Sequence, residues 1–256
     1  MNIPKSDRFE PLVTGPLALE RVRVTFREDR PALPGPLAQQ IDALWSREGG
    51  AGSRGLFDGR LAGLGRWRYD SVALELDLVP VRYRELWYVH VLAGKIEVPR
   101  PEVLPRALGI SAVVLQGEVV LLMLRSGRVG EWPGKLDVFG GHVDWPEGRE
   151  PDDPAEATRK ELEEELGKAG RRSNLTRCLG LAEVVRTHKP EIVYLARLPE
   201  DATVSLRDTN EEVEELVRLP LAGLTEQLAE RWDELTPSAE ASLWLLALAS
   251  SSGLHP

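Results

Sequence analysis

Three glutamates, Glu161, Glu164 and Glu165, stand close together in the second half of the chain. If this segment is helical, their carboxylates fall within an arc of about 100°, beside an apolar flank that includes Leu162 and Leu166. Like charges four positions apart destabilise a helix, and uncompensated charge beside a core is costly. Mg²⁺ prefers oxygen ligands, keeps some of its waters and bridges to substrate phosphates. The spacing therefore predicts a site for a divalent cation, Mg²⁺ or alternatively Mn²⁺; a solvated helix face is the other interpretation.

The residues around these glutamates predict how the helix is positioned. A glycine pair at 140–141 allows a sharp turn and a close approach of the backbone to a ligand. Pro154 suits the first helical turn, and Asp152 or Asp153 can serve as the N-cap. Gly167 can end the helix. Paired glycines at a strand end, then a loop and then this helix favour the cation site over the solvated face.

The same stretch resembles the signature of the Nudix hydrolases, which reads Gly-x5-Glu-x7-Arg-Glu-Leu-x-Glu-Glu-x-Gly. Residues 160–167 match its second half, with Lys160 in place of the arginine. Glu-Ala-Thr at 156–158 is similar to the family's Glu-Ala-Ala. The loop after Gly141 is longer than the signature allows. Counting from its two ends therefore gives two candidates for the first acid of the signature, Glu147 and Asp152.

The resemblance implies a Nudix-type pyrophosphohydrolase, in which water attacks phosphorus in a nucleoside diphosphate linked to another moiety. It also implies that Glu161, Glu164 and Glu165 are the catalytic metal ligands, with the backbone carbonyl of Gly140 as a further ligand. The chemistry agrees, because a bound metal polarises phosphate oxygens and lowers the pKa of water. Phosphoryl transfer otherwise needs mainly positioning and charge neutralisation.

The general base stays open between two groups of carboxylates. Glu164 or Glu165 of the signature could serve. A loop acid, Glu211 or Glu212, could serve instead, although a solvated surface charge is the other interpretation for these two.

The fold implied by the resemblance is α/β (α+β): a Nudix-like α/β/α sandwich with a mixed sheet over residues 101–256, preceded by a smaller α+β extension over residues 1–100. The proline-rich segment 98–106 looks like a stiff, extended linker between them. Apolar patterns predict helices over 35–50, 82–94 and around 243–249, the last capped by Thr236 or Ser238. Strands are expected over 17–27, over 109–115 and 118–126, in a hairpin of 175–186 with 191–198, and after residue 210 ahead of a helix. Two further strands around a glycine turn are expected within 55–81.

The extension and the long signature loop resemble a branch of Nudix proteins that includes a UDP-glucose and UDP-galactose pyrophosphatase. The similarity lies in Leu-Phe-Asp-Gly at 56–59 and Tyr-Arg-Glu at 83–85. It implies hydrolysis of a UDP-sugar to UMP and a sugar 1-phosphate. The alternatives are ADP-ribose or dinucleotide hydrolysis and a non-catalytic nucleotide sensor, but all three glutamates are kept, which favours an enzyme. Candidate substrate-binding residues are Arg125, His142 and Tyr83, although Arg125 could be solvated and Tyr83 could pack the extension.

Composition limits the partners. The net charge of −9 argues against a broad nucleic-acid interface but not against a small nucleotide substrate held through a metal. The single cysteine, Cys178, excludes a disulfide within the chain and fits a reducing, cytoplasmic location. No secretory signal is seen at the start, and the longest apolar run is too short to span a membrane. A homodimer is compatible with the sequence.

Overall fold

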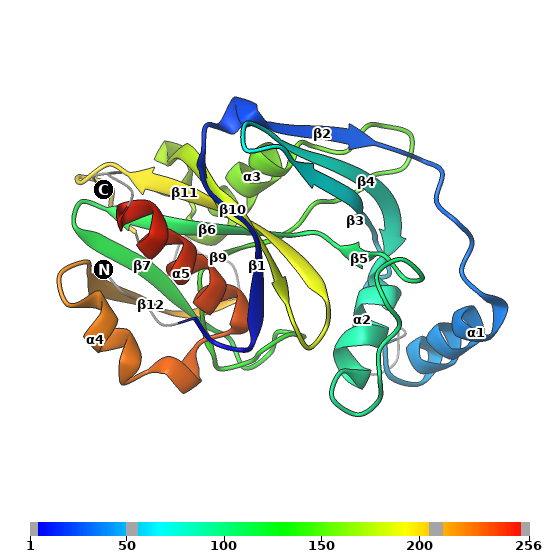
Figure 1. The fold of residues 1–256 in the computed structure, drawn as a ribbon. Coiled ribbons are helices and arrows are strands. Elements are labelled where there is room, and N and C mark those ends of the chain that lie inside the picture. Colours follow the sequence, from blue (N-terminus) through cyan, green and yellow to red (C-terminus); the bar gives the residue numbers. More distant parts are fainter. Residues whose placement is uncertain (1–4, 50–55, 205–211, 252–256) are drawn as a thin grey trace.

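The structure is a computed structural model and describes residues 5–49, 56–204 and 212–251. A mixed sheet of eight strands dominates the described residues (Figure 1). Its main path runs β1 (Phe9–Leu17), β10 (Asn174–Val184), β11 (Lys189–Leu198), β6 (Gly109–Gln116), β7 (Val119–Arg125) and β12 (Val213–Pro220). Two short strands, β8 (Leu136–Asp137) and β9 (Phe139–His142), pair with β7 and β6. Only the β11–β6 pair of these described strands is parallel, as expected for a mixed sheet.

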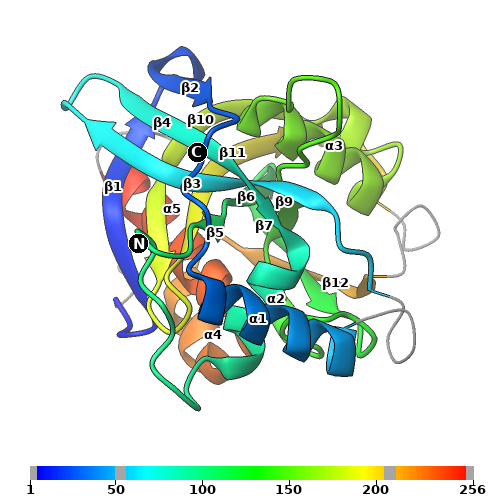
Figure 2. The same ribbon diagram turned by 90° about the vertical axis from the view of Figure 1, so that its right-hand side faces the viewer.

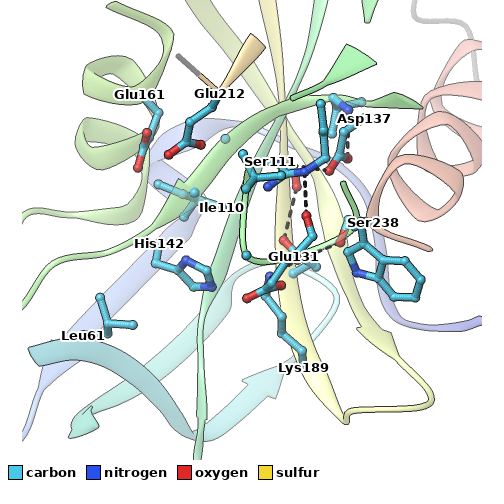
Figure 3. A pocket seen from close by; sticks show the side chains of 18 of the residues that line it. Leu61, Ile110, Ser111, Glu131, Asp137, His142, Glu161, Lys189, Glu212 and Ser238 are labelled. Atoms are coloured by element: carbon cyan, nitrogen blue, oxygen red, sulfur yellow. Dashed lines mark hydrogen bonds and ion pairs between the residues drawn. The ribbon is translucent and has the colours of Figure 1, made fainter. Parts of the chain in front are cut away.

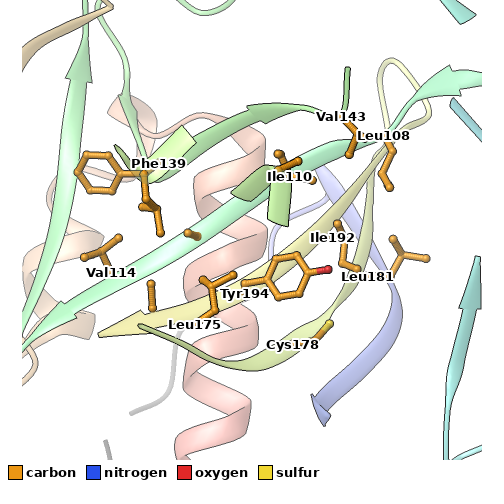
Figure 4. Packing of buried hydrophobic residues seen from close by; sticks show 14 of the residues in the cluster. Leu108, Ile110, Val114, Phe139, Val143, Leu175, Cys178, Leu181, Ile192 and Tyr194 are labelled. Carbon is orange, nitrogen blue, oxygen red and sulfur yellow. The ribbon is translucent and has the colours of Figure 1, made fainter. Parts of the chain in front are cut away.

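Helices cover both faces of this sheet, which confirms the expected α/β/α sandwich. On one face, Leu162 and Leu166 of α3 (Pro154–Leu166) join a large buried cluster. Figure 4 shows Ile110 and Tyr194 of this cluster. On the other face, α5 (Pro237–Ser251) packs on a second cluster around Val113. Because both faces of β6 are covered, its sequence is a continuous apolar run rather than an alternating one.

A smaller sheet of four strands packs against the cluster that contains Ile110 and Tyr194. Its strand order is β2 (Val22–Phe26), β4 (Leu74–Arg82), β3 (Arg60–Tyr69) and β5 (Arg106–Ala107). The expected strand over 17–27 is therefore only partly right, since a 3₁₀ turn (Leu19–Arg21) separates β1 from β2. The expected glycine turn is wrong: the β3–β4 turn is built by Asp70, whose Oδ1 accepts hydrogen bonds from the N–H groups of Val72 and Ala73. Glycines 63 and 65 lie inside β3 instead.

Two helices of the N-terminal region pack against each other beside the small sheet (Figure 2). They are α1 (Gly35–Leu44), extended by a π-turn (Trp45–Gly49), and α2 (Tyr83–Leu92). Ile41 and Leu44 of α1 meet Tyr88 and Val89 of α2 in one buried cluster. Both helices were expected, the first of them from the spacing of its apolar residues.

The remaining elements follow the expected order. Strand β12 leads into α4 (Leu224–Ala229), and two further 3₁₀ turns lie at Gly170–Arg172 and Trp232–Glu234. Thr236 caps α5, because its hydroxyl accepts the N–H of Ala239 at 3.0 Å. None of the helices in the described part of the chain is long and apolar enough to cross a membrane.

The proline-rich segment 98–106 is not an extended linker, which corrects that expectation. The N–H groups of Val103 and Leu104 both turn back to the carbonyl of Arg100. Leu104 and Arg106 are buried, and the Arg106 guanidinium donates to the carbonyls of Pro99, Leu104 and Thr187. The first strand, β1, also pairs with β10 of the large sheet. The division of the chain at residue 100 stays a prediction.

Candidate active site

A cavity of about 730 Å³ lies where β6, β7, β9 and β11 end and where the extension meets the large sheet (Figure 3). This volume is typical of sites for small organic ligands. Its walls combine elements from the whole chain. They comprise Leu56, Leu61, Tyr83, Ile110, Ser111, Arg125, Arg128, Val129, Gly130, Glu131, Trp132, Asp137, Val138, Gly140, Gly141, His142, Asp144, Glu161, Lys189, Glu191, Glu212 and Ser238.

The glycine pair and Glu161 line one end of this cavity, and Glu165 is buried behind Gly140. The N–H of Gly140 donates to Oε2 of Glu165 at 2.8 Å. Gly140 has φ of +149°, and a β-carbon there would lie 1.9 Å from the carbonyl oxygen of Ile110, so only glycine fits. A β-carbon at Gly141 would lie 2.2 Å from Oε1 of Glu161. Both glycines thus let β9 approach its neighbours closely.

The helix that carries these glutamates begins and ends where the sequence predicts. Asp153 is the N-cap and accepts the N–H of Ala155 at 2.8 Å, with Pro154 as the first helical residue. Gly167 ends the helix with φ of +58°. Leu162 is fully buried, so the helix is fixed by its apolar face and presents Glu161 to the cavity.

The carboxylates at this end repel one another. Burial raises the pKa of Glu161 to about 7, and repulsion from Glu164 and Glu212 adds to the increase. Asp144, which follows β9 and lines the cavity, contributes further. Burial also holds the pKa of Glu165 well above its ordinary value, with additional repulsion from Glu161. Figure 3 shows Glu161 and Glu212 at the same end of the cavity.

These residues fit a divalent cation in chemistry. Oε1 of Glu165 is buried and has no hydrogen-bond partner among the described residues. A cation would offset both the repulsion and this missing contact. Glu164 is exposed and does not line the cavity, and within the described ranges no three acidic, histidine or cysteine side chains form a ready cage. Of the three glutamates, Glu161 lines the cavity, and Glu165 is buried behind it with Oε2 accepting the N–H of Gly140.

The opposite end of the cavity contains a second group of charges. Oε2 of Glu131 lies 3.6 Å from Nζ of Lys189, which is also 3.1 Å from Oε1 of Glu191. Burial would raise the pKa of Glu131, but Lys189 and the neighbouring His142 lower it to about 2. Although burial disfavours its charge, Glu131 and Glu191 hold the pKa of Lys189 above its ordinary value. Arg125 interacts with Glu131 of this group and also with Glu212 and Glu165 of the other, so it lies between the two ends.

The three residues predicted to bind substrate line this one cavity. Nε of Arg125 donates to the backbone carbonyl of Glu131 at 3.0 Å, and Nη1 lies 3.3 Å from Asp137. Burial lowers the pKa of His142 to about 3, and its Nε2 is buried without a partner in the described part of the chain. Burial raises the pKa of Tyr83 to about 12. Arg125 is 15% exposed, so a freely solvated arginine is not what the structure shows.

The other predicted acids lie in different places. Glu147 is exposed, and Asp152 pairs with Lys160 at 2.5 Å, so neither lines the cavity. Glu212 does line it, whereas Glu211 lies outside the described residues. Four charged residues of the cavity wall were not predicted from the sequence: Glu131, Asp144, Lys189 and Glu191. Charged side chains at the start of an apolar strand, as in Lys-Pro-Glu-Ile, are the signal that could have found two of them.

Comparison with known proteins identifies the family. A profile described as the NUDIX domain matches residues 105–239. The chain belongs to the NUDIX domain family. This confirms the family resemblance of the glutamate motif and the expected enzyme class, a Nudix-type pyrophosphohydrolase. A search among curated proteins gave no match.

Solved structures similar to this Nudix protein have low sequence identity. A NUDIX hydrolase from Nitrosomonas europaea is 14% identical, with a TM-score of 0.42 over 56% of this chain and 90% of that chain. A UDP-X diphosphatase is 18% identical, with a TM-score of 0.39 over 64% and 69%. A bifunctional NMN adenylyltransferase/ADP ribose pyrophosphatase from Francisella tularensis, complexed with AMP and Mn, is 10% identical, with a TM-score of 0.42 over 66% and 47%. The family assignment rests on the profile alone.

Proposed function

We propose that this Nudix protein hydrolyses a UDP-sugar to UMP and a sugar 1-phosphate with a divalent cation, Mg²⁺ or Mn²⁺. The observation that carries the proposal is one cavity with two different ends. Glu161 and Glu212 stand at one end, and the polar network of Glu131 and Lys189 stands at the other. A diphosphate requires a cation, and a sugar requires hydrogen-bonding groups.

The extension supports a substrate larger than a simple nucleoside diphosphate. Leu56, Leu61 and Tyr83 come from the N-terminal region and line the same cavity as Glu161. They add an apolar and aromatic wall, on which a base or a ribose can pack. This wall is the structural reason to favour the UDP-sugar branch of the family. It also supports treating residues 1–100 as an extension that completes the site of a hydrolase domain over 101–256.

The residues at the cation end have separable roles. When bound, the cation would polarise the phosphate oxygens and lower the pKa of the attacking water. Glu161, Glu165 and the carbonyl of Gly140 would hold it, with Glu164 joining from the exposed side. Arg125, which interacts with charged groups at both ends of the cavity, can neutralise charge on phosphates bound between them.

For the general base, Glu212 and Glu165 are better placed than Glu164. Glu212 lines the cavity, and Glu165 lies directly beneath Gly140. Both repel the carboxylate of Glu161 or each other, which supports a base on the same side of the cavity as the proposed cation. Neither Glu164 nor Glu165 lines the cavity, but Glu165 is buried beside Gly140 whereas Glu164 is exposed.

A panel of substrates with Mg²⁺ tests the proposal. UDP-glucose, UDP-galactose, ADP-ribose and a dinucleoside polyphosphate are each incubated with the protein, and the products are separated by ion-exchange chromatography. We expect UMP and a sugar 1-phosphate to form fastest. Rapid turnover of ADP-ribose or the dinucleotide, with UDP-sugars left intact, would assign the alternative pyrophosphatase activity. Binding of nucleotides without any turnover would assign the sensor.

Variants of α3 test the cation site within the same assay. Glu164→Gln and Glu165→Gln should abolish turnover while leaving the fold intact. Glu156→Gln is the matched control, because Glu156 lies on the same helix, is exposed and pairs only with Arg159 among the described residues. Unchanged rates in the first two variants would refute the cation ligands.

A further inference from the structure

The polar network at the far end of the cavity is a built site. Nζ of Lys189 lies between Oε1 of Glu191 at 3.1 Å and Oε2 of Glu131 at 3.6 Å. The hydroxyls of Ser111 and Ser238 donate to Glu191 at 3.2 and 2.8 Å. The side chains of Glu131, Lys189 and Glu191 are only 14%, 13% and 3% exposed. Buried charges of this kind are costly to keep, and a structural role alone would favour apolar residues.

The network also keeps hydrogen-bonding capacity that the described residues leave unused. Within that part of the chain, the Glu131 carboxylate has an ion pair with Lys189 but accepts no hydrogen bond. Lys189 has three donors, and Glu191 lies within hydrogen-bond reach of only one. Nε2 of His142 is buried and unpartnered on the same cavity wall. Acceptors and donors therefore face the cavity together, and buried groups of this kind normally have partners.

The balance of charge indicates what those partners are. Glu131, Glu191 and Asp137 carry three negative charges, and Lys189 and Arg125 carry two positive ones. The group therefore has one excess negative charge, which disfavours a phosphate beside Glu131. An apolar group would leave the ammonium and carboxylate without partners, which is costly in a buried site. The edge of a base offers donors and acceptors in one plane only, whereas the hydroxyls of a sugar point in several directions around its ring. Hydroxyl groups donate and accept hydrogen bonds and carry no charge. They can therefore donate to Glu131, accept from Lys189 and pair with Nε2 of His142.

We propose that Glu131, Lys189 and His142 form the subsite for the hydroxyl groups of the sugar, and that Glu131 is its specificity-determining acceptor. This inference rests on the proposed function, because it assigns one end of the same cavity to the sugar part of the substrate. Two features of the protein position these side chains before substrate binds: one hydrogen bond and one glycine. Nε of Arg125 holds the backbone carbonyl of Glu131 at 3.0 Å, which positions the loop between β7 and β8. A β-carbon at Gly109 would lie 2.2 Å from Oε2 of Glu191, so glycine makes room for that carboxylate.

The test compares two substrates that share one phosphoanhydride bond. UDP-glucose carries the hydroxyls of glucose. In the β-methyl ester of UDP, a methyl group replaces the glucose, and the uridine part is the same. We expect Glu131→Gln to lower kcat/KM for UDP-glucose about 10- to 100-fold and to leave kcat/KM for the methyl ester nearly unchanged. His142→Leu should show the same selective loss, and it removes no ion pair. The thermal unfolding of each variant is measured in the same buffer.

Glu85→Gln is the matched control. Glu85 is equally a buried, ion-paired carboxylate, held by Arg30 at 2.7 and 2.8 Å, but it does not line the cavity. It should change the two substrates alike. If Glu131→Gln and His142→Leu also reduce both substrates equally while wild type cleaves UDP-glucose, the subsite is refuted and the proposed function stands. If wild type cleaves the methyl ester or ADP-ribose but not UDP-glucose, the proposed substrate fails and the subsite fails with it.

Discussion

Gly141 is in direct contact with the carboxylate of Glu161, since a β-carbon at position 141 would lie 2.2 Å from Oε1 and 2.7 Å from Cδ. The nearest atoms belong to the end of a long side chain and not to the backbone. A larger residue at 141 can therefore be accommodated by moving Glu161 and leaving the fold in place. The glycine determines where the carboxylate lies.

Gly141→Ala is accordingly expected to separate activity from stability. Displacing Glu161 by about 1 Å should lower kcat/KM about 100-fold, while the thermal unfolding temperature stays close to that of wild type. Steady-state kinetics with Mg²⁺ and a thermal scan measure the two effects. Gly35→Ala is the control, because a β-carbon there meets nothing within 4 Å. Equal kinetics for the two alanine variants would contradict this role for Gly141.

Divalent cations are expected to stabilise the folded protein through Glu165. Oε1 of Glu165 is buried without a hydrogen bond from the described residues, so a bound ion adds a contact that the unfolded chain lacks. At about 100 times the dissociation constant, Mg²⁺ should add about 2.7 kcal/mol to the free energy of unfolding. Chelation with EDTA should remove that increment from wild type and have little effect on Glu165→Gln. The same increment in both proteins would show that the ion binds elsewhere.

The stability contributed by Glu131 should depend on pH. Lys189 and Arg125, with His142 and His90, face this carboxylate, and together they overcome its burial and lower its pKa from 4.5 to about 2. Because the folded pKa lies below the unfolded one, the contribution is complete above pH 4.5 and is lost as pH falls towards 2. Glu131→Gln should therefore cost about 1–3 kcal/mol at pH 7 and progressively less in acid. Urea unfolding from pH 7 to pH 3 measures the difference, and a pH-independent difference would refute it.

The N-cap of α3 gives a simpler prediction. Asp153→Ala should reduce the free energy of unfolding by about 1 kcal/mol, because the carboxylate accepts the N–H of Ala155. Asp152→Ala removes only the exposed ion pair with Lys160 and should cost between about 0 and 1 kcal/mol. Parallel denaturant titrations compare the two. A larger loss for Asp152→Ala would mean that the cap had been assigned to the wrong aspartate.

Local patterns in the sequence predicted most of the elements. Apolar periodicity and turn residues close in sequence predicted helix α3, the β6–β7 hairpin at Gly117 and the hairpin of β10 with β11. Two predictions, the glycine turn and the proline-rich linker, were wrong because a polar side chain sets the backbone conformation there. Asp70 makes the β3–β4 turn without glycine, and Arg106 folds a proline-rich segment onto itself by binding three carbonyls.

The site was predictable only in the part that is contiguous in sequence. The glycines and the α3 glutamates lie within one stretch, and their spacing carries the chemistry. Lys189 and Glu131 are far apart in the chain. They meet because β11 runs parallel to β6 and the β7–β8 loop lines the same cavity as the start of β11. The contact between Lys189 and Glu131 cannot be predicted from the residues next to either of them, because it depends on the order of strands in the sheet.

The pairing of β1 with β10 also has a consequence for how the chain is made. Phe9 lies opposite Val184 in the finished sheet. At about 5–20 residues per second, the ribosome needs roughly ten to thirty seconds to reach β10 after it has made β1. The small sheet is complete once β5, at Ala107, has been made, so it can close well before then. During that interval the backbone N–H and C=O groups of β1 have no partner strand. We therefore expect a chaperone or a second nascent chain to bind first at this segment.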